Sequence, residues 1–230
     1  MRPSQRSGAP PGPRPRPAAP RRRTQAERRS ATSSLLLEAA IACLVERGYA
    51  ATTTLEVARR AGVSQGALFK HYPTKVGLLV AAVARLYARL RDDFRRDLAE
   101  AEQRRDRIRA ALELLDSVFA RAEVTASLEL HMAARTDDDL RAAFAPVAGE
   151  HHRRILELAR DLFPGATAHD RRFDTFIDLA VAVLQGAAVG ALAQPARADH
   201  PELLDALEWL ARRELDQAIA PETSGPPEIS

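Results

Sequence analysis

Cysteine is almost absent from this chain, which has only Cys43 among its 230 residues. A single cysteine excludes an intrachain disulfide framework and fits a protein of the reducing cytoplasm. Aromatic residues make up only 5% of the sequence, and no segment alternates apolar and polar residues as a half-buried strand does. Alanine and leucine are abundant instead, which favours helices. The hydrophobic fraction of 46% is sufficient for a core.

Long hydrophobic runs are also missing. The longest weakly polar stretch, residues 176–193, is interrupted by Asp178, Gln185 and two glycines. We therefore expect no membrane helix, which needs about 20 apolar residues, and no membrane partner. The basic N-terminus has no apolar segment after it, which argues against a secretory signal.

Lysine is nearly absent too, since 32 of the 34 basic residues are arginine and the only lysines are Lys70 and Lys75. Positive charge is concentrated early in the chain. Residues 1–75 contain 14 basic and four acidic residues, whereas residues 76–230 contain 20 basic and 27 acidic ones. This asymmetry indicates a polyanion-binding module beside a domain with another task, although a merely solvated surface would have the same composition.

The chain divides into four regions. Residues 1–23 contain seven Pro, seven Arg and no acid, so we predict a disordered basic arm. Residues 24–73 predict three helices and a DNA-binding domain, and residues 221–230 predict a disordered tail. Residues 74–220 predict a second helical domain, with helices at about 74–98, 101–121, 123–135, 138–162, 169–193 and 200–219. The predicted fold class is all-α: a three-helix helix-turn-helix head plus a helical bundle.

Two short helices follow the first long one. Thr53 and Glu56 have the spacing of a capping box, Gly62 ends that helix, and Ser64 begins another that continues to about Tyr72. Two short helices joined by a tight glycine-containing turn are typical of a helix-turn-helix.

The second short helix, "SQGALFKHY", has the composition of a helix that enters the major groove. Leu68 and Tyr72 lie one turn apart and are expected to face inward. Gln65 can then hydrogen-bond a base edge, while Gly66 and Ala67 are small enough to let the helix approach the bases closely.

Phosphate contacts are expected at both ends of this motif. Lys70, His71 and Lys75 follow the base-contacting residues, and Thr53 and Thr54 begin the preceding helix, where free backbone N–H groups favour phosphate. Lysine is a compact point charge suited to single phosphate contacts, which explains the position of the two lysines; chance placement is the alternative.

The stretch "TTTLEVARRAGVSQGALFKHYPTKVGLL" resembles the TetR family of bacterial transcriptional regulators over about residues 30–80. The shared features are the threonine-led helix, the A-x-x-A-G-V-S turn, the aromatic–x–His–aromatic spacing and the final lysine. Phe69 matches an aromatic that is often a tyrosine with a phosphate-binding hydroxyl, and Leu55 stands where some relatives place a polar base-contacting residue. The candidate DNA-binding residues are Thr53, Thr54, Ser64, Gln65, Gly66, Ala67, Phe69, Lys70, His71 and Lys75.

The resemblance further implies that the second domain binds a small, usually hydrophobic effector and forms a homodimer through its last two long helices. Candidate effector-binding residues are Phe119, Leu128, His131, Met132, Phe144 and Gln185, although ordinary core or surface positions would have the same appearance. Candidate dimer-interface residues are Phe176, Ala182, Gly186, Gly190, Leu203, Leu207 and Leu210, with burial inside a monomer as the alternative.

No cofactor is expected. The segment "HHRRILE" from residue 151 contains adjacent histidines, which point apart on a helix and have no carboxylates at ligand spacing, so no metal site is predicted. We expect a cytoplasmic, nucleoid-associated repressor that binds a palindromic site in double-stranded DNA as a homodimer. The alternatives are a helical enzyme with an accessory DNA-binding head, for which no catalytic set is visible, and a helical protein-interaction module.

Overall fold

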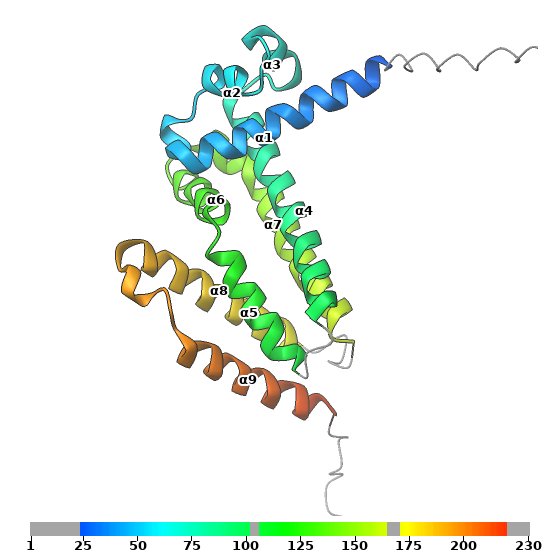
Figure 1. Cartoon of the computed structure of the whole chain (residues 1–230), viewed down its shortest axis with the longest axis vertical. Helices are drawn as coiled ribbons and strands as arrows, with labels where there is room; N and C mark the ends of the chain where they lie inside the picture. The colour runs from blue at the N-terminus through cyan, green and yellow to red at the C-terminus, as the bar shows by residue number, and fades with distance from the viewer. Residues whose placement is uncertain (1–23, 102–105, 165–170, 220–230) are drawn as a thin grey trace, which may run out of the picture.

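The computed structural model describes residues 24–101, 106–164 and 171–219, which are helical apart from short connections and contain no strand (Figure 1). The elements are α1 (Gln25–Ala51), α2 (Thr54–Arg60), α3 (Gln65–His71), α4 (Lys75–Ala101), α5 (Arg107–Phe119), α6 (Ala122–Ala133), α7 (Asp138–Leu162), α8 (Arg171–Ala193), the 3-10 helix η1 (Pro195–Arg197) and α9 (Pro201–Ile219). The all-α prediction is confirmed. The predicted arm at 1–23 and tail at 221–230 lie outside the described residues.

Side-chain caps determine where the first helices begin. The Thr24 hydroxyl accepts a hydrogen bond from the Glu27 N–H, and the Glu27 carboxylate accepts one from the Thr24 N–H. In the same way, the Thr53 hydroxyl accepts the Glu56 N–H at the start of α2, and the Ser64 hydroxyl accepts the Ala67 N–H at the start of α3. The Glu56 carboxylate pairs with arginines, so only the Thr53 half of the predicted capping box forms. Each cap contributes about 1 kcal/mol to stability.

Local features set two of the helix boundaries. α1 continues to Ala51 across a kink at Gly48, whose φ of 73° lies in the left-handed region that glycine tolerates. α5 begins at Arg107 rather than near residue 101, because the Asp106 carboxylate accepts the Arg109 N–H at 3.2 Å and caps the helix there.

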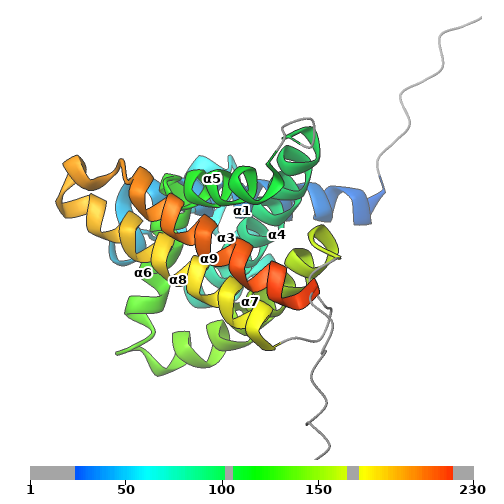
Figure 2. The ribbon, with the colours of Figure 1, turned by 90° about the horizontal axis from the view of Figure 1, so that it is seen from below.

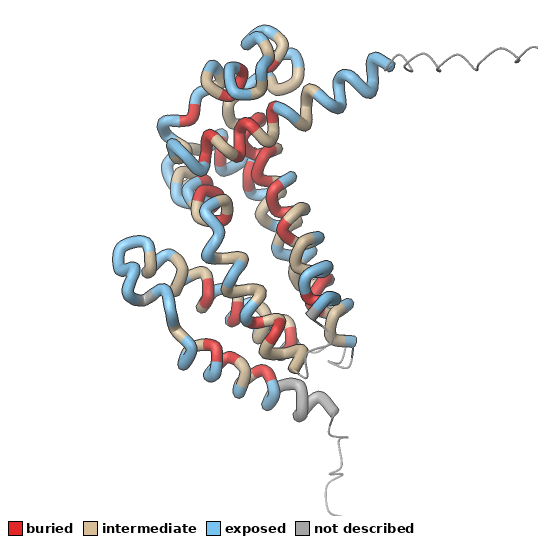
Figure 3. The backbone as a smooth tube through the Cα atoms, viewed as in Figure 1, coloured by how far each residue is buried: buried red, intermediate tan, exposed pale blue. Residues whose placement is uncertain are grey.

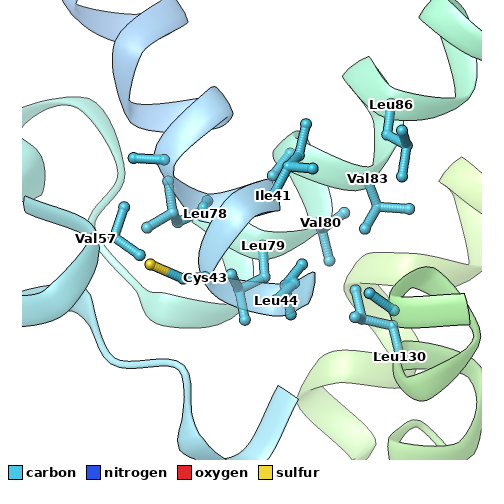
Figure 4. Close-up of a cluster of buried hydrophobic side chains, with 14 of the residues drawn as sticks. Ile41, Cys43, Leu44, Val57, Leu78, Leu79, Val80, Val83, Leu86 and Leu130 are labelled. Carbon is cyan, nitrogen blue, oxygen red and sulfur yellow. The ribbon is translucent and has the colours of Figure 1, made fainter. Parts of the chain in front are cut away.

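One hydrophobic cluster joins the short N-terminal helices to the rest of the molecule (Figure 4). Leu68 from α3, Leu79 from α4 and Leu130 from α6 are fully buried in it. The buried cluster is therefore continuous across residue 74, where the sequence predicts a domain boundary. Cys43 is also fully buried there, and burial raises the pKa of its thiol, as expected of an unreactive packing residue.

A second, smaller cluster holds the C-terminal helices together. α5 packs against both α8 and α9, and its Leu112 meets Ala180 and Leu184 from α8 and Leu204 and Leu207 from α9. Figure 2 shows α8 and α9 running side by side beneath the molecule. α4 and α7 pack along each other and connect this lower part to the upper one (Figure 1).

α8 is strongly apolar, although little of it is buried inside the chain. It is long and apolar enough, by length and composition alone, to cross a membrane, so the expectation that no segment reaches this length was wrong. Only 17% of its most apolar 18-residue window is buried within the chain. Much of the surface of α8 is consequently exposed (Figure 3).

Candidate functional site

The outer face of α3 is open to solvent, whereas its inner face is held firmly. Leu68 anchors the helix from behind, and the Tyr72 hydroxyl lies 2.7 Å from the Ser33 hydroxyl of α1. Both inward-facing positions were predicted. Gln65, Gly66 and Lys70 are exposed on the other side, so α3 can approach a flat or grooved partner without rearranging the core.

The neighbouring α2 contributes to the same surface. The Gln65 amide donates to the Thr54 hydroxyl at 3.2 Å, which links the first residues of the two short helices. Gly66 is exposed, and a Cβ atom added there would meet nothing within 4 Å, so a partner could approach this side of the backbone closely. Leu55 is 63% exposed and Phe69 is 42% exposed, so this surface also carries two large apolar side chains.

The remaining predicted DNA-binding residues also surround this surface. Thr53 and Ser64 are exposed cap residues, while Ala67 and His71 are half-buried on α3. Their positions agree with the predicted surface, and their contacts with DNA stay a prediction.

Lys75 has a different environment from the one predicted. Its ammonium group donates to the backbone oxygens of Tyr49 at 2.9 Å and Ala50 at 3.4 Å, and it lies 4.8 Å from the centre of the Tyr49 ring. Partial burial lowers the pKa of Lys75. The lysine therefore stabilises the last carbonyls of α1, a position favourable for a cation, and its charge is already engaged inside the protein.

Tyr49 also connects α1 to α6 and α7. Its backbone N–H donates to a Glu129 carboxylate oxygen at 2.6 Å, and its hydroxyl donates to Asp137 at 3.2 Å. A Cβ atom at Gly48 would lie 2.6 Å from the same Glu129 carboxylate, so a larger residue there would displace the end of the Glu129 side chain in addition to adopting a positive φ. The polar Glu129 thus holds the N-terminal helices against the body.

A cavity of about 160 Å³ lies between the long helices of the body. Its walls come mainly from α4, α5, α7 and α8 and are almost entirely apolar, with three polar side chains: Tyr87, Arg91 and His151. His151 stacks on Tyr87 with ring centres 3.7 Å apart, and its Nδ1 lies 2.8 Å from an Arg91 nitrogen. Burial, and secondarily the charge of Arg91, lowers the pKa of His151 to about 4.

Of the predicted effector-binding residues, only Phe119 lines this cavity. α6 packs mainly against α1, so Leu128 is partly buried away from the cavity, Met132 is 70% exposed, and His131 lies edge-on against Phe144. Phe144 belongs to the upper core, and Gln185 lies outside the cavity on α8. The lining of a cavity depends on which helix faces meet, and the sequence of one helix does not show this.

A periodic signal in the sequence marks the walls that were missed. His151, Ile155, Leu158 and Leu162 follow one another at intervals of three or four residues along α7, and all line the cavity. Tyr87, Leu90, Arg91 and Phe94 form the matching stripe on α4. Arg91 and His151 interrupt these two apolar stripes, and this interruption is the signal that could have pointed to polar groups in the cavity.

The predicted dimer residues fall into two groups. Ala182, Gly186 and Gly190 are exposed on α8, and nothing lies within 4 Å of a Cβ atom added at either glycine. Leu207 is only 4% exposed and packs against α5 and α8 inside the chain, which agrees with the alternative of burial within a monomer. Phe176 and Leu203 pack partly on the same cluster, and Phe176 also lines the cavity; Leu210 is half-buried.

The adjacent histidines of α7 point apart, as predicted. His151 faces the cavity, whereas the Nδ1 of His152 lies 3.5 Å from an Asp178 oxygen of α8. Within residues 24–101, 106–164 and 171–219, no three His, Cys, Asp or Glu side chains gather as a metal-binding group.

Comparison with known proteins agrees with this arrangement. Residues 36–82 match the family model for bacterial regulatory proteins of the tetR family. An uncharacterized HTH-type transcriptional regulator of Mycobacterium tuberculosis is 36% identical over 176 residues, which cover 75% of this chain and 90% of the relative. The HTH-type transcriptional regulator CymR of Pseudomonas putida is 37% identical over 138 residues, 60% of this chain and 68% of CymR.

Solved structures share the fold. A transcriptional regulator from a Rhodococcus species superposes with a TM-score of 0.60 at 23% identity, covering 82% of this chain and 99% of the other. The multidrug binding protein EbrR, solved in complex with imidazole, gives a TM-score of 0.54 at 25% identity over 83% of this chain and 97% of EbrR. Family members of this kind regulate transcription and are not enzymes, which removes the enzyme alternative. The chain therefore belongs to the TetR family of helix-turn-helix transcriptional regulators.

Proposed function

We propose that this regulator is a homodimeric repressor that binds a palindromic operator and releases it when a small hydrophobic effector enters the body cavity. Residues 24–73 would bind DNA, and residues 74–220 would bind the effector and the second subunit. The observation that carries the proposal is the exposed outer face of α3, anchored from behind by Leu68, with Gln65 at its start. In a dimer, two such helices would enter successive major grooves about 34–36 Å apart.

The exposed face of α8 supports the homodimer. Leu179, Ala182, Gly186, Val189 and Gly190 recur at helical spacing on one exposed side of α8. Small residues on this side permit close approach of a second helix, and an exposed apolar patch of this kind is typical of an interface. A second copy of α8 and α9 would cover it as a four-helix arrangement.

The cavity supports response to an effector. Its walls are apolar, it has few polar groups, and it lies in the body, connected to the N-terminal helices through α4. EbrR, which has the same fold, is named a multidrug binding protein. An effector that binds the released arrangement more tightly than the DNA-bound one would lower DNA affinity by the ratio of these two affinities.

DNA binding is tested by fluorescence anisotropy with the segment upstream of the protein's own gene and with random DNA of equal length. We expect a discrete complex whose affinity falls steeply with salt. Gln65→Ala should reduce the difference in binding free energy between the upstream segment and random DNA by about 1–3 kcal/mol. Gln194→Ala, an exposed glutamine on the opposite part of the molecule, is the matched control and should change nothing. A wild-type protein that binds both DNAs equally would refute an operator-specific role.

Dimerisation is tested by sedimentation velocity on two matched leucine variants. Leu179 and Leu55 are both exposed in the single chain, at 43% and 63%. Leu179→Glu places a charge in the proposed interface and should shift the protein toward monomer, whereas Leu55→Glu should leave the dimer intact. A wild-type protein that sediments as a monomer at micromolar concentration would refute the dimer.

A further inference from the structure

The cavity contains a single cationic side chain in otherwise apolar walls. Among the lining residues in the described ranges 24–101, 106–164 and 171–219, only Arg91 carries a full positive charge, and no Asp or Glu lines the cavity. Arg91 lies on α4 between Leu90 and Phe94, opposite His151 of α7. Arg91 is partly buried, and withdrawing part of its charge from water costs free energy unless an anion or several acceptors compensate it.

The partner of Arg91 is neutral. A guanidinium can only donate hydrogen bonds, so the His151 Nδ1 at 2.8 Å must be the acceptor, and the proton of the neutral imidazole must lie on Nε2. Stacking on Tyr87 fixes the ring plane. The other N–H groups of the Arg91 guanidinium therefore stay available to a further acceptor, and the neutral His151 does not cancel the positive charge of Arg91.

Carboxylates near Arg91 do not neutralise it either. Asp92 and Glu157 are close enough to affect its pKa, but neither forms an ion pair with it in the described part of the chain. Glu157 pairs instead with Arg154, as does Glu150. Burial lowers the pKa of Arg91, yet an arginine stays protonated at neutral pH.

We propose that the effector is a hydrophobic monocarboxylic acid, whose carboxylate binds Arg91 beside His151 and whose hydrocarbon body fills the apolar cavity. This inference rests on the proposed effector-binding role of the cavity and specifies its ligand class. Arginine and carboxylate form paired, charge-assisted hydrogen bonds, which explains why an arginine rather than a lysine suits this place. An apolar cavity of about 150 Å³ accommodates benzene, so a volume of about 160 Å³ fits a body on the order of six to eight carbon atoms.

Calorimetric titration of the full-length protein tests the ligand class without DNA. The probes are octanoate, 1-octanol and octylamine at pH 7.5, which share the hydrocarbon chain and differ in the charge of the head group. We expect octanoate to bind about 10- to 100-fold more tightly than 1-octanol, and octylamine to bind most weakly. Equal affinities for octanoate and 1-octanol, or no binding of octanoate, would overturn the proposal whatever the variants do.

Two arginine variants locate the charge. Arg91→Met introduces an unbranched apolar side chain. It should lower the affinity for octanoate about 10- to 100-fold and change the affinity for 1-octanol by less than threefold. Arg95→Met is the matched control, because Arg95 lies one turn further along α4, is 55% exposed and pairs with Asp161 outside the cavity. Octanoate affinity that survives Arg91→Met would overturn the assignment of the carboxylate to Arg91.

These outcomes are distinguishable from failure of the regulatory role. A protein that binds its operator and ignores octanoate would retain the repressor function and lose the carboxylate proposal. A protein that binds octanoate through Arg91 and shows no operator preference would retain the ligand class and lose the repressor function.

Discussion

Acidification from pH 7 to pH 5 should destabilise this protein through His151, and the variant His151→Phe should abolish that part of the effect. The imidazole is buried against Tyr87 and faces the positive charge of Arg91, and both features lower its pKa from 6.5 to about 4. In the unfolded chain the histidine binds a proton near pH 6.5, whereas in the folded protein it does so only near pH 4. The contribution of neutral His151 to the free energy of unfolding is therefore fully present above pH 6.5 and is lost as the pH falls toward 4.

The size of the effect follows from the two pKa values. The interval from 6.5 to about 4 sets a ceiling of about 3 kcal/mol, and the part reached between pH 7 and pH 5 is about 2 kcal/mol. The ring retains some contact with solvent, so we expect a measured loss of about 1–2 kcal/mol. This is a considerable share of the 5–15 kcal/mol that stabilises a typical domain.

Urea denaturation at several pH values and one fixed protein concentration measures this effect, since dimerisation makes stability depend on concentration. Phenylalanine keeps an aromatic ring against Tyr87 and cannot titrate, so His151→Phe should lose about 1–2 kcal/mol less than the wild type between pH 7 and pH 5. The matched control is His152→Phe, because His152 is the next residue of α7 and is 55% exposed. Parallel pH profiles for the wild type and His151→Phe would refute the reasoning.

Three further changes test the contacts around the N-terminal helices. Gly48→Ala should lower the free energy of unfolding by at least about 1 kcal/mol more than Gly62→Ala, because both glycines have positive φ but only Gly48 faces Glu129. Urea denaturation of the same two variants in a Glu129→Ala background should show no such difference, and equal losses in the wild-type background would contradict the reasoning. Lys75→Met should lower stability by about 1.5–3 kcal/mol and leave the salt dependence of DNA binding unchanged, whereas a slope smaller by about one would place Lys75 on a phosphate as the sequence predicted. Phe69→Tyr should tighten binding to operator and random DNA alike by about 0.5–1.5 kcal/mol in anisotropy titrations if its exposed ring lies beside a phosphate, and an unchanged affinity would exclude that contact.

The N-terminal helices were predictable because their signals are local. A capping threonine or serine and the N–H it binds lie three residues apart, so Thr53 and Ser64 mark helix starts without any knowledge of the fold. The inward position of Leu68 and Tyr72 follows from helical periodicity in the same way. The outer face of α3 could be identified once its inner face was known.

The body was less predictable because its features arise between distant segments. The sequence predicted most of its helices, but whether a face of α6 meets α1 or the cavity depends on helices about 80 residues apart. His131 and His151 are therefore alike in sequence, and only packing places His151 against Tyr87 and Arg91 in the cavity. Lys75 shows the same limit, because its carbonyl acceptors belong to the end of α1, about 25 residues earlier.

The sequence alone determined the all-α class, the two short capped helices and the family, because each depends on spacings of a few residues. Tertiary structure alone decided which polar groups face the cavity, which leucines of α8 and α9 are buried, and what Lys75 binds. Those outcomes depend on how long helices pack against one another, and many amphipathic patterns are compatible with more than one packing.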